Sequence, residues 1–101
     1  MKQVLVIVKP FLAERALEAI SDLQVDALDV HEVKGYGRQK SYLDASTEQD
    51  RSLAFLPKVE IHCWVKDSQV DYFINSVSEV ARTGRMGDGK IFVLPVAQVT
   101  E

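Results

Sequence analysis

The sequence contains a single cysteine, Cys63, and only two histidines, His31 and His62. One thiol excludes an internal disulfide and a Cys-x-x-Cys metal clip. His62 and Cys63 are neighbours on an expected strand, so their side chains should point to opposite faces. A lone histidine on a strand is more often a packing residue than a ligand. The pattern therefore predicts no dedicated metal site.

Long apolar runs are also missing from the chain. No stretch approaches the roughly 18 to 20 apolar residues that span a bilayer, and the N-terminus lacks the pattern of a signal peptide. A length of 101 residues with 47% apolar content fits one soluble globular domain, residues 1–101. We therefore expect a cytoplasmic protein that is not embedded in a membrane.

An excess of positive charge is likewise absent, because the net charge is −3. This balance argues against general affinity for nucleic acid. The cations nonetheless gather in two places: segment 34–40 carries +3 and segment 82–90 carries +2. An acidic body with two small basic patches fits a compact anionic ligand better than a polyanion. The alternative is that both patches are ordinary solvated loops.

The segment richest in glycine and positive charge is Arg82-Thr83-Gly84-Arg85-Met86-Gly87-Asp88-Gly89-Lys90, which has three glycines and three cations in nine residues. Backbone N–H groups can converge on a phosphate where no Cβ intervenes, and arginine and lysine add opposite charge. Gly84 equally suits a plain helix stop. The residues alone leave both interpretations open, and neither a Walker nor a dinucleotide pattern names a ligand.

Apolar periodicity predicts four strands and two helices in the order β-α-β-β-α-β. The expected strands are 1–9, 27–36, 58–66 and 91–94, and the expected helices are 11–23 and 70–81, the second capped by Asp67 or Ser68. Pro95 disfavours a central position for the last strand. This order is typical of the ferredoxin-like α+β fold, with both helices on one side of the sheet.

A long polar loop, about 37–55, is expected between the second and third strands. Compact domains rarely carry loops beyond about 12 to 15 residues without a functional reason. Its best use is to fold against a partner, and the alternative is a disordered insertion.

The first strand contains Val4-Leu5-Val6-Ile7-Val8, which is apolar on both faces. Helices on one side leave the other face bare, and another copy of the chain is the economical cover. The sequence therefore predicts a homo-oligomer in which the two basic stretches meet in a pocket shared between subunits.

These pieces resemble the nitrogen-regulatory PII signal-transduction family. The segments that carry the resemblance are Ile7-Val8-Lys9-Pro10-Phe11, Glu32-Val33-Lys34-Gly35-Tyr36-Gly37-Arg38-Gln39-Lys40, Phe55-Leu56-Pro57-Lys58-Val59 and Thr83-Gly84-Arg85-Met86-Gly87-Asp88-Gly89-Lys90-Ile91-Phe92-Val93. The resemblance implies a ferredoxin-like homotrimer that binds ATP or ADP in three clefts between subunits. It also implies a regulator that makes and breaks no bond.

The family pattern also implies roles for individual residues. The phosphates would lie against Gly87, Asp88, Gly89 and Lys90, and Gly37, Arg38 and Gln39 would close the opposite wall. Gln39 would help to hold a Mg²⁺ ion that bridges ATP and 2-oxoglutarate, and Lys58 would contact the 2-oxoglutarate. The liganded cleft would fix the base of the long loop, which docks on a membrane transporter or a metabolic enzyme.

The sequence departs from the family pattern in three places. The loop reads Ala45-Ser46-Thr47-Glu48-Gln49-Asp50-Arg51 where many members carry a uridylylated tyrosine, so that modification is not expected. The printed chain stops short of the usual C-terminal arginine pair, from which we expect weaker triphosphate binding. Asp29, His62 and Trp64 differ from the family near the adenine, where Trp64 would stack on the base or lie in a subunit contact.

Two other functions remain as alternatives. A trimer with the same fold would sense another ligand, a metal ion or a different adenine nucleotide, for a transport or heavy-metal efflux system. An enzyme is the remaining alternative, although no nucleophile and base pair can be identified from the spacing.

Overall fold

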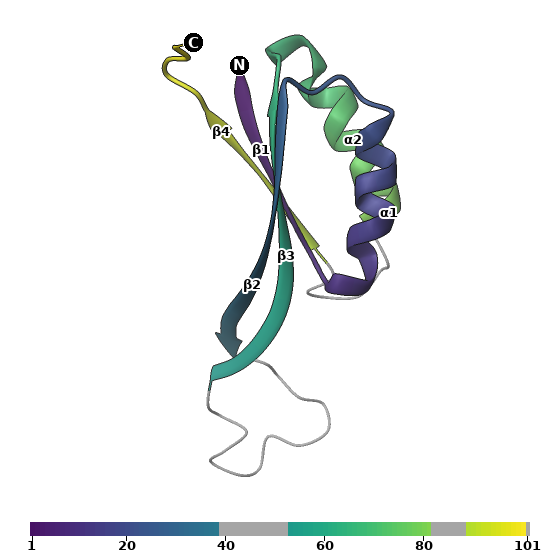
Figure 1. Ribbon diagram of the computed structural model, residues 1–101, viewed down its shortest axis with the longest axis vertical. Helices are drawn as coiled ribbons and strands as arrows, with labels where there is room; N and C mark the ends of the chain where they lie inside the picture. The colour runs from purple at the N-terminus through teal and green to yellow at the C-terminus, as the bar shows by residue number, and fades with distance from the viewer. Residues whose placement is uncertain (39–52, 82–88, 101) are drawn as a thin grey trace.

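The computed structural model describes residues 1–38, 53–81 and 89–100. Within these ranges the elements follow the predicted order β-α-β-β-α-β. They are β1 Lys2–Val8, α1 Pro10–Ser21, β2 Ala27–Arg38, β3 Leu53–Val65, the 3-10 turn η2 Asp67–Gln69, α2 Val70–Ala81 and β4 Gly89–Pro95. Figure 1 shows the helices as one layer and the strands as another.

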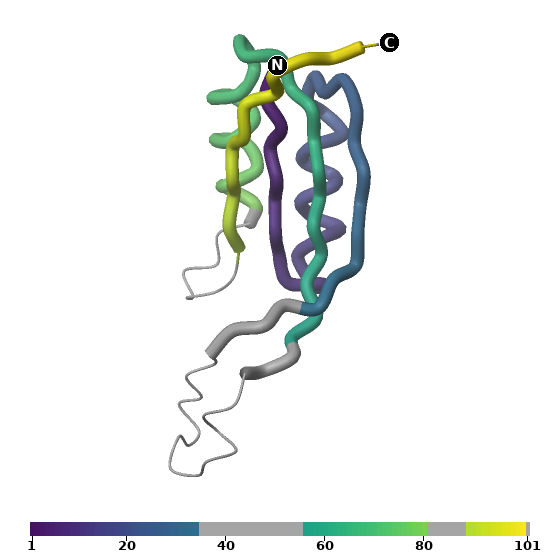
Figure 2. The backbone as a smooth tube through the Cα atoms, turned by 90° about the vertical axis from the view of Figure 1, so that its left-hand side faces the viewer, coloured from purple at the N-terminus to yellow at the C-terminus, as the bar shows by residue number. Residues whose placement is uncertain are grey.

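The strands form one antiparallel sheet in the order β2-β3-β1-β4. β1 lies in the middle and pairs along its whole length with β3 on one side and β4 on the other. Both helices cover the same face of the sheet (Figure 1), and Figure 2 views the sheet from its other face. The predicted ferredoxin-like α+β fold is therefore confirmed.

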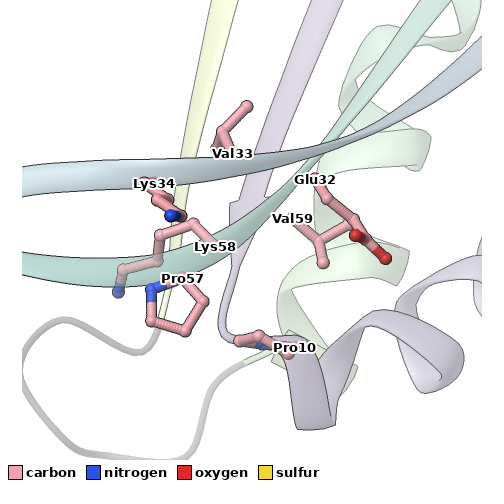
Figure 3. Close-up of a pocket in the computed structure, with 7 residues that line it drawn as sticks. All are labelled: Pro10, Glu32, Val33, Lys34, Pro57, Lys58 and Val59. Carbon is pink, nitrogen blue, oxygen red and sulfur yellow. The ribbon is translucent and has the colours of Figure 1, made fainter.

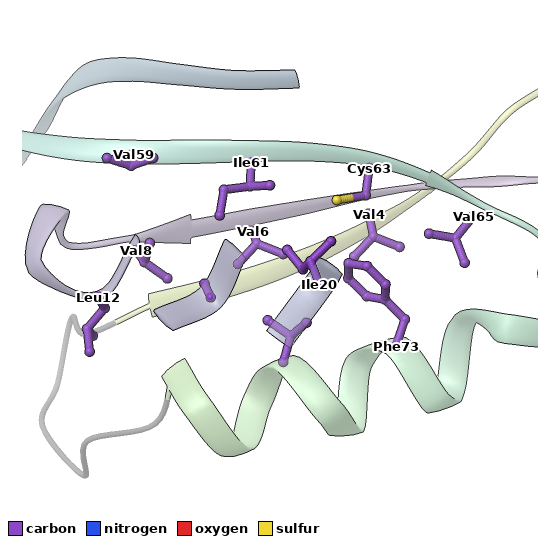
Figure 4. Close-up of a cluster of buried hydrophobic side chains, with 12 residues drawn as sticks. Val4, Val6, Val8, Leu12, Ile20, Val59, Ile61, Cys63, Val65 and Phe73 are labelled. Atoms are coloured by element: carbon purple, nitrogen blue, oxygen red, sulfur yellow. The ribbon is translucent and has the colours of Figure 1, made fainter. Parts of the chain in front are cut away.

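The core lies between the sheet and the helices, because alternate side chains of β1 and β3 point toward α1 and α2 (Figure 4). Each helix contributes residues spaced three or four apart, which fall on one side of a helix. The buried apolar side chains are Val4, Val6, Val8, Leu12, Ala16, Ile20, Val59, Ile61, Cys63, Val65, Phe73 and Val77.

The other face of the sheet, which we call the open face, carries no helix (Figure 2). Strand alternation and register assign its side chains. They are Ala27, Asp29 and His31 of β2, Glu60, His62 and Trp64 of β3, Gln3, Leu5 and Ile7 of β1, and Lys90, Phe92 and Leu94 of β4. Leu5 and Ile7 are half-buried, so in the single chain β1 is fully buried on its helix side only.

α1 begins at Pro10, whose fixed φ suits the first helical position and whose missing N–H would have no partner there. The helix ends at Ser21, two residues before the predicted Leu23. The Ser21 hydroxyl donates to the Glu18 carbonyl oxygen at 2.6 Å, and the Leu23 N–H donates to the Ile20 oxygen at 2.9 Å. This tighter last turn still packs Leu23 against the core.

β3 begins at Leu53 and runs through Pro57, although Pro57 was expected to precede the strand. At this point Pro57 pairs with Lys34 of β2, whereas β1 has already ended opposite Val59. Proline is tolerated there because β3 has a neighbour on one side only. The β2–β3 ribbon therefore extends to the pair Arg38 and Leu53, and both ends of the predicted loop 37–55 belong to strands.

β4 begins at Gly89, so Gly89 and Lys90 lie in a strand and not in the glycine-rich loop 82–90. Pairing explains the difference, because Gly89 lies opposite Val8 and the ladder with β1 is complete. Pro95 ends an edge strand, as predicted.

The segment before α2 differs from the predicted cap. Asp67 begins the turn η2, and no side chain caps that turn. The Asp67 carboxylate instead accepts a hydrogen bond from the α-amino group of Met1 at 2.8 Å. This bond lowers the pKa of Asp67 and ties the start of β1 to the entrance of α2. In the described ranges, no helix combines the length and apolarity that a bilayer crossing needs.

Phe73 and Tyr72 are adjacent on α2 but differ in environment. Phe73 is 1% exposed in the core and Tyr72 is 64% exposed. We expect Phe73→Ala to lower the free energy of unfolding by about 3 to 5 kcal/mol through a core cavity. The matched variant Tyr72→Ala should change it by no more than about 0.5 kcal/mol. Urea unfolding at one fixed protein concentration measures both, and equal effects would contradict this core.

Burial raises the pKa of the Cys63 thiol from its ordinary value of 9.0 to about 12. Above pH 9 the unfolded chain therefore loses this proton while the folded chain keeps it, so the free energy of unfolding should fall as pH rises toward 12. We expect the pH dependence of the free energy of unfolding in this range to be shallower for Cys63→Ala.

A thiol reagent at pH 8 should label Cys63 in urea but not in the folded protein. Rapid labelling without urea would contradict the burial of Cys63.

Candidate functional site

One end of the sheet collects the features to which the sequence assigned anion binding. β1 ends there at Val8, which lies between Val59 of β3 and Gly89 of β4. The β2–β3 ribbon continues beyond this end of the sheet, as Figure 1 shows. The start of β4 and the base of the ribbon therefore flank the same turn from β1 into α1.

Lysines from four different segments lie at this end. Lys9 follows β1, Lys34 lies in β2, Lys58 in β3 and Lys90 in β4. Lys34 and Lys90 are exposed, and Lys58 is half-buried. Lys9, Lys34 and Lys58 also take part in interactions within the chain. Several cations at one edge create a positive potential that favours small anions.

A pocket of about 390 Å³ lies at the base of the β2–β3 ribbon (Figure 3). Its lining residues are Pro10, Glu32, Val33, Lys34, Pro57, Lys58 and Val59. In Figure 3 the ammonium nitrogens of Lys34 and Lys58 lie toward one side of the pocket and the Glu32 carboxylate toward the other. This size and this mixture of apolar walls with a few charges suit a small organic anion.

Sequence reasoning had identified Lys58 and the basic character of Lys34, but not the pocket as a unit. Pro10, Glu32 and Val59 reach it only through the β2–β3 and β1–β3 registers. The signal available in advance was the resemblance itself, since the segments quoted for it include all seven lining residues.

The predicted nucleotide-binding residues Lys90 and Trp64 lie at different ends of the sheet. Lys90 is exposed on the open face opposite Ile7, at the same end as the pocket. Trp64 is half-buried on the same face but opposite Gln3, near the other end of the sheet. Because Ile7 and Gln3 are four residues apart on β1, the two positions are offset by about 13 Å along the strands. Within one chain they are not brought together.

The remaining predicted site residues divide in two groups. The backbones of Gly37 and Arg38 extend the ribbon opposite Ala54 and Leu53. Gln39, Gly87 and Asp88 lie outside the described residues. Their assignment to a nucleotide site stays a prediction.

Fold and site together define a small ferredoxin-like α+β domain with a basic pocket at the base of a long two-stranded ribbon. The chain matches the family described as "Nitrogen regulatory protein P-II" over residues 1–101. It is 46% identical over 99 residues to the nitrogen regulatory protein GlnK of Escherichia coli (strain K12), an alignment that covers 98% of this chain and 88% of that protein.

Two further relatives align over the same shares of both chains. The nitrogen regulatory protein P-II of Pasteurella multocida (strain Pm70) is 41% identical, and that of Azospirillum brasilense is 40% identical. This chain therefore belongs to the P-II family of nitrogen regulatory proteins. The resemblance inferred from the motifs is confirmed.

Proposed function

We propose that this protein is a non-catalytic signal-transduction regulator. It binds an adenine nucleotide, ATP or ADP, in clefts between the subunits of a homotrimer. Ligand binding controls a partner transporter or metabolic enzyme through the segment 37–55. The observation that carries the proposal is the meeting of Gly89, Lys90 and the Lys34–Lys58 pocket at one end of the sheet, in a chain of the P-II family.

Assembly is supported by the apolar side chains on the open face. Phe92 is 47% exposed and Leu94 is 42% exposed, and they adjoin half-buried Leu5 and Ile7. A contiguous apolar strip of this kind is costly to leave in water. Copies of the chain packed through this face would cover it and would bring the edges of neighbouring protomers together.

A cleft shared by two protomers would bring together predicted nucleotide-binding residues that lie far apart within one chain. In one chain Lys90 and Trp64 lie at different ends of the sheet. A cleft at the border of two protomers can draw phosphate ligands from one chain and a second wall from its neighbour. The phosphates would lie at the glycine-rich segment before β4, beside the Lys90 ammonium.

The pocket at the ribbon base supplies the second ligand in this proposal. Lys58 would pair with a carboxylate of 2-oxoglutarate, and a Mg²⁺ ion would link that ligand to the nucleotide through Gln39. Because the pocket is lined by both strands of the ribbon, an anion bound there changes the charge balance at the base of segment 37–55. Regulation would then need no chemical step.

We expect Lys90→Ala to weaken ATP and ADP binding about 10- to 150-fold, since a hydrogen bond to a charged group contributes about 1.5 to 3 kcal/mol. Isothermal titration with ATP, ADP and AMP, with and without Mg²⁺, measures the effect. Lys66→Ala is the matched control, because Lys66 is exposed beyond the other end of β3. Wild-type affinity in Lys90→Ala, or no binding of any adenine nucleotide at millimolar concentration, would contradict the proposal.

The same titration separates the two ligands. With nucleotide and Mg²⁺ present, Lys58→Ala should lose 2-oxoglutarate binding and keep nucleotide binding. Equal 2-oxoglutarate binding by Lys58→Ala and Lys66→Ala would remove this ligand from the proposal.

A further inference from the structure

The only two histidines of the chain, which are 31 positions apart in the sequence, come together on the open face. The ring centroids of His31 and His62 are 4.7 Å apart, with an angle of 47° between the ring planes. The pairing depends on the β2–β3 register, which places His31 opposite Glu60 and His62 opposite Asp29. The two imidazoles therefore occupy one diagonal of a four-residue group, and the two carboxylates occupy the other.

The carboxylate of Glu60 adjoins the histidine pair directly. Its Oε1 lies 3.0 Å from His62 Nε2, and both side chains are only about a quarter exposed. On the β1 side the neighbours are apolar, since Leu5 lies opposite His62 and Ile7 opposite Glu60. With neutral imidazoles the group carries the two negative charges of Glu60 and Asp29, which favours a cation.

We propose that His31 and His62 form a two-imidazole site for a borderline divalent cation such as Zn²⁺, Ni²⁺ or Cu²⁺. Imidazole nitrogen is a preferred ligand of these ions. An ion about 2.0 to 2.1 Å from each nitrogen lies about 3.2 Å from each ring centre, so two rings bound at roughly 90 to 110° have centres about 4.5 to 5.2 Å apart. The observed separation of 4.7 Å falls in this range.

Glu60 is placed to support the bound ion. Its Oε1 lies 3.0 Å from His62 Nε2, so the carboxylate stands beside one of the proposed ligand side chains and can pair with a bound cation.

The site is an open one. Among the described residues, no group of three or more histidine, cysteine, aspartate or glutamate side chains already stands in coordinating positions. In the proposed site the two imidazoles are the ligands from this chain, and the other positions are left to water, to Glu60 after a side-chain rotation, or to an exogenous ligand.

Trp64 makes the proposal testable without a label. It is the only tryptophan of the chain, and its ring centroid lies 6.4 Å from that of His62. In tag-free protein, Cu²⁺ and Ni²⁺ should quench Trp64 fluorescence with saturation, whereas Mg²⁺ should not, because it prefers oxygen ligands. We expect His31→Ala and His62→Ala each to weaken binding by more than about tenfold, the loss typical even for groups that only orient a metal ligand.

Two control variants isolate the site. Cys63→Ala should bind the metal as the wild type does, because the Cys63 side chain is fully buried on the opposite face. Lys90→Ala should also keep metal binding, so that failure of the nucleotide proposal does not decide this one. Circular dichroism establishes that each variant is folded. Wild-type affinity in both histidine variants would overturn the proposal.

A measurement on the wild-type chain avoids any doubt about folding of the variants. Two histidines give two C2-proton signals in an NMR spectrum, and both should shift together with Zn²⁺ as the ion is added. A shift of one signal alone, or of neither, would overturn the two-imidazole site.

Discussion

Two helices can cover only one face of the four-stranded sheet, and the rest of the structure depends on that constraint. The valines of β1 and β3 are buried against α1 and α2, whereas the uncovered side carries Leu5, Ile7, Phe92 and Leu94. The hydrophobic effect that stabilises one side thus leaves a surface that favours association on the other. In our account one chain is enough to form the fold, but the ligand-binding clefts form only between chains.

The same constraint arranges the functional groups. β1 ends before the β2–β3 ribbon does, so the ribbon projects past the sheet and a pocket forms at its base, next to the start of β4. Cations from segments far apart in the sequence therefore share one end of the molecule. The histidine pair lies on the part of the open face contributed by β2 and β3, and His31 shares a row of the sheet with Glu60, Ile7 and Lys90. The two proposals, anion binding at the ribbon base and metal binding at the histidine pair, thus use side chains of the same four-stranded sheet.

Apolar periodicity was sufficient to predict the elements and their order. The buried positions of β1, β3 and both helices are occupied by apolar residues at the spacing of a strand or a helix. It failed at element ends, where pairing partners decide the outcome. Pro57 is accepted in β3 because β1 has ended beside it, and Gly89 joins β4 because Val8 is there to pair with it.

The site was predictable only in part, for the same reason. Lys58 and Lys90 were identified through motifs. The contact between His31 and His62 was not, because nothing in a linear spacing encodes the register of two distant strands. The distance along the sheet between Trp64 and Lys90 was equally hidden.

The mass of the assembled protein tests the central claim most directly. Native mass spectrometry of tag-free protein measures it without assumptions about shape. A chain of 11.3 kDa whose apolar strip on the open face is covered by its own copies should appear as a species of three chains. A protein that remains a single chain at all concentrations would contradict the account.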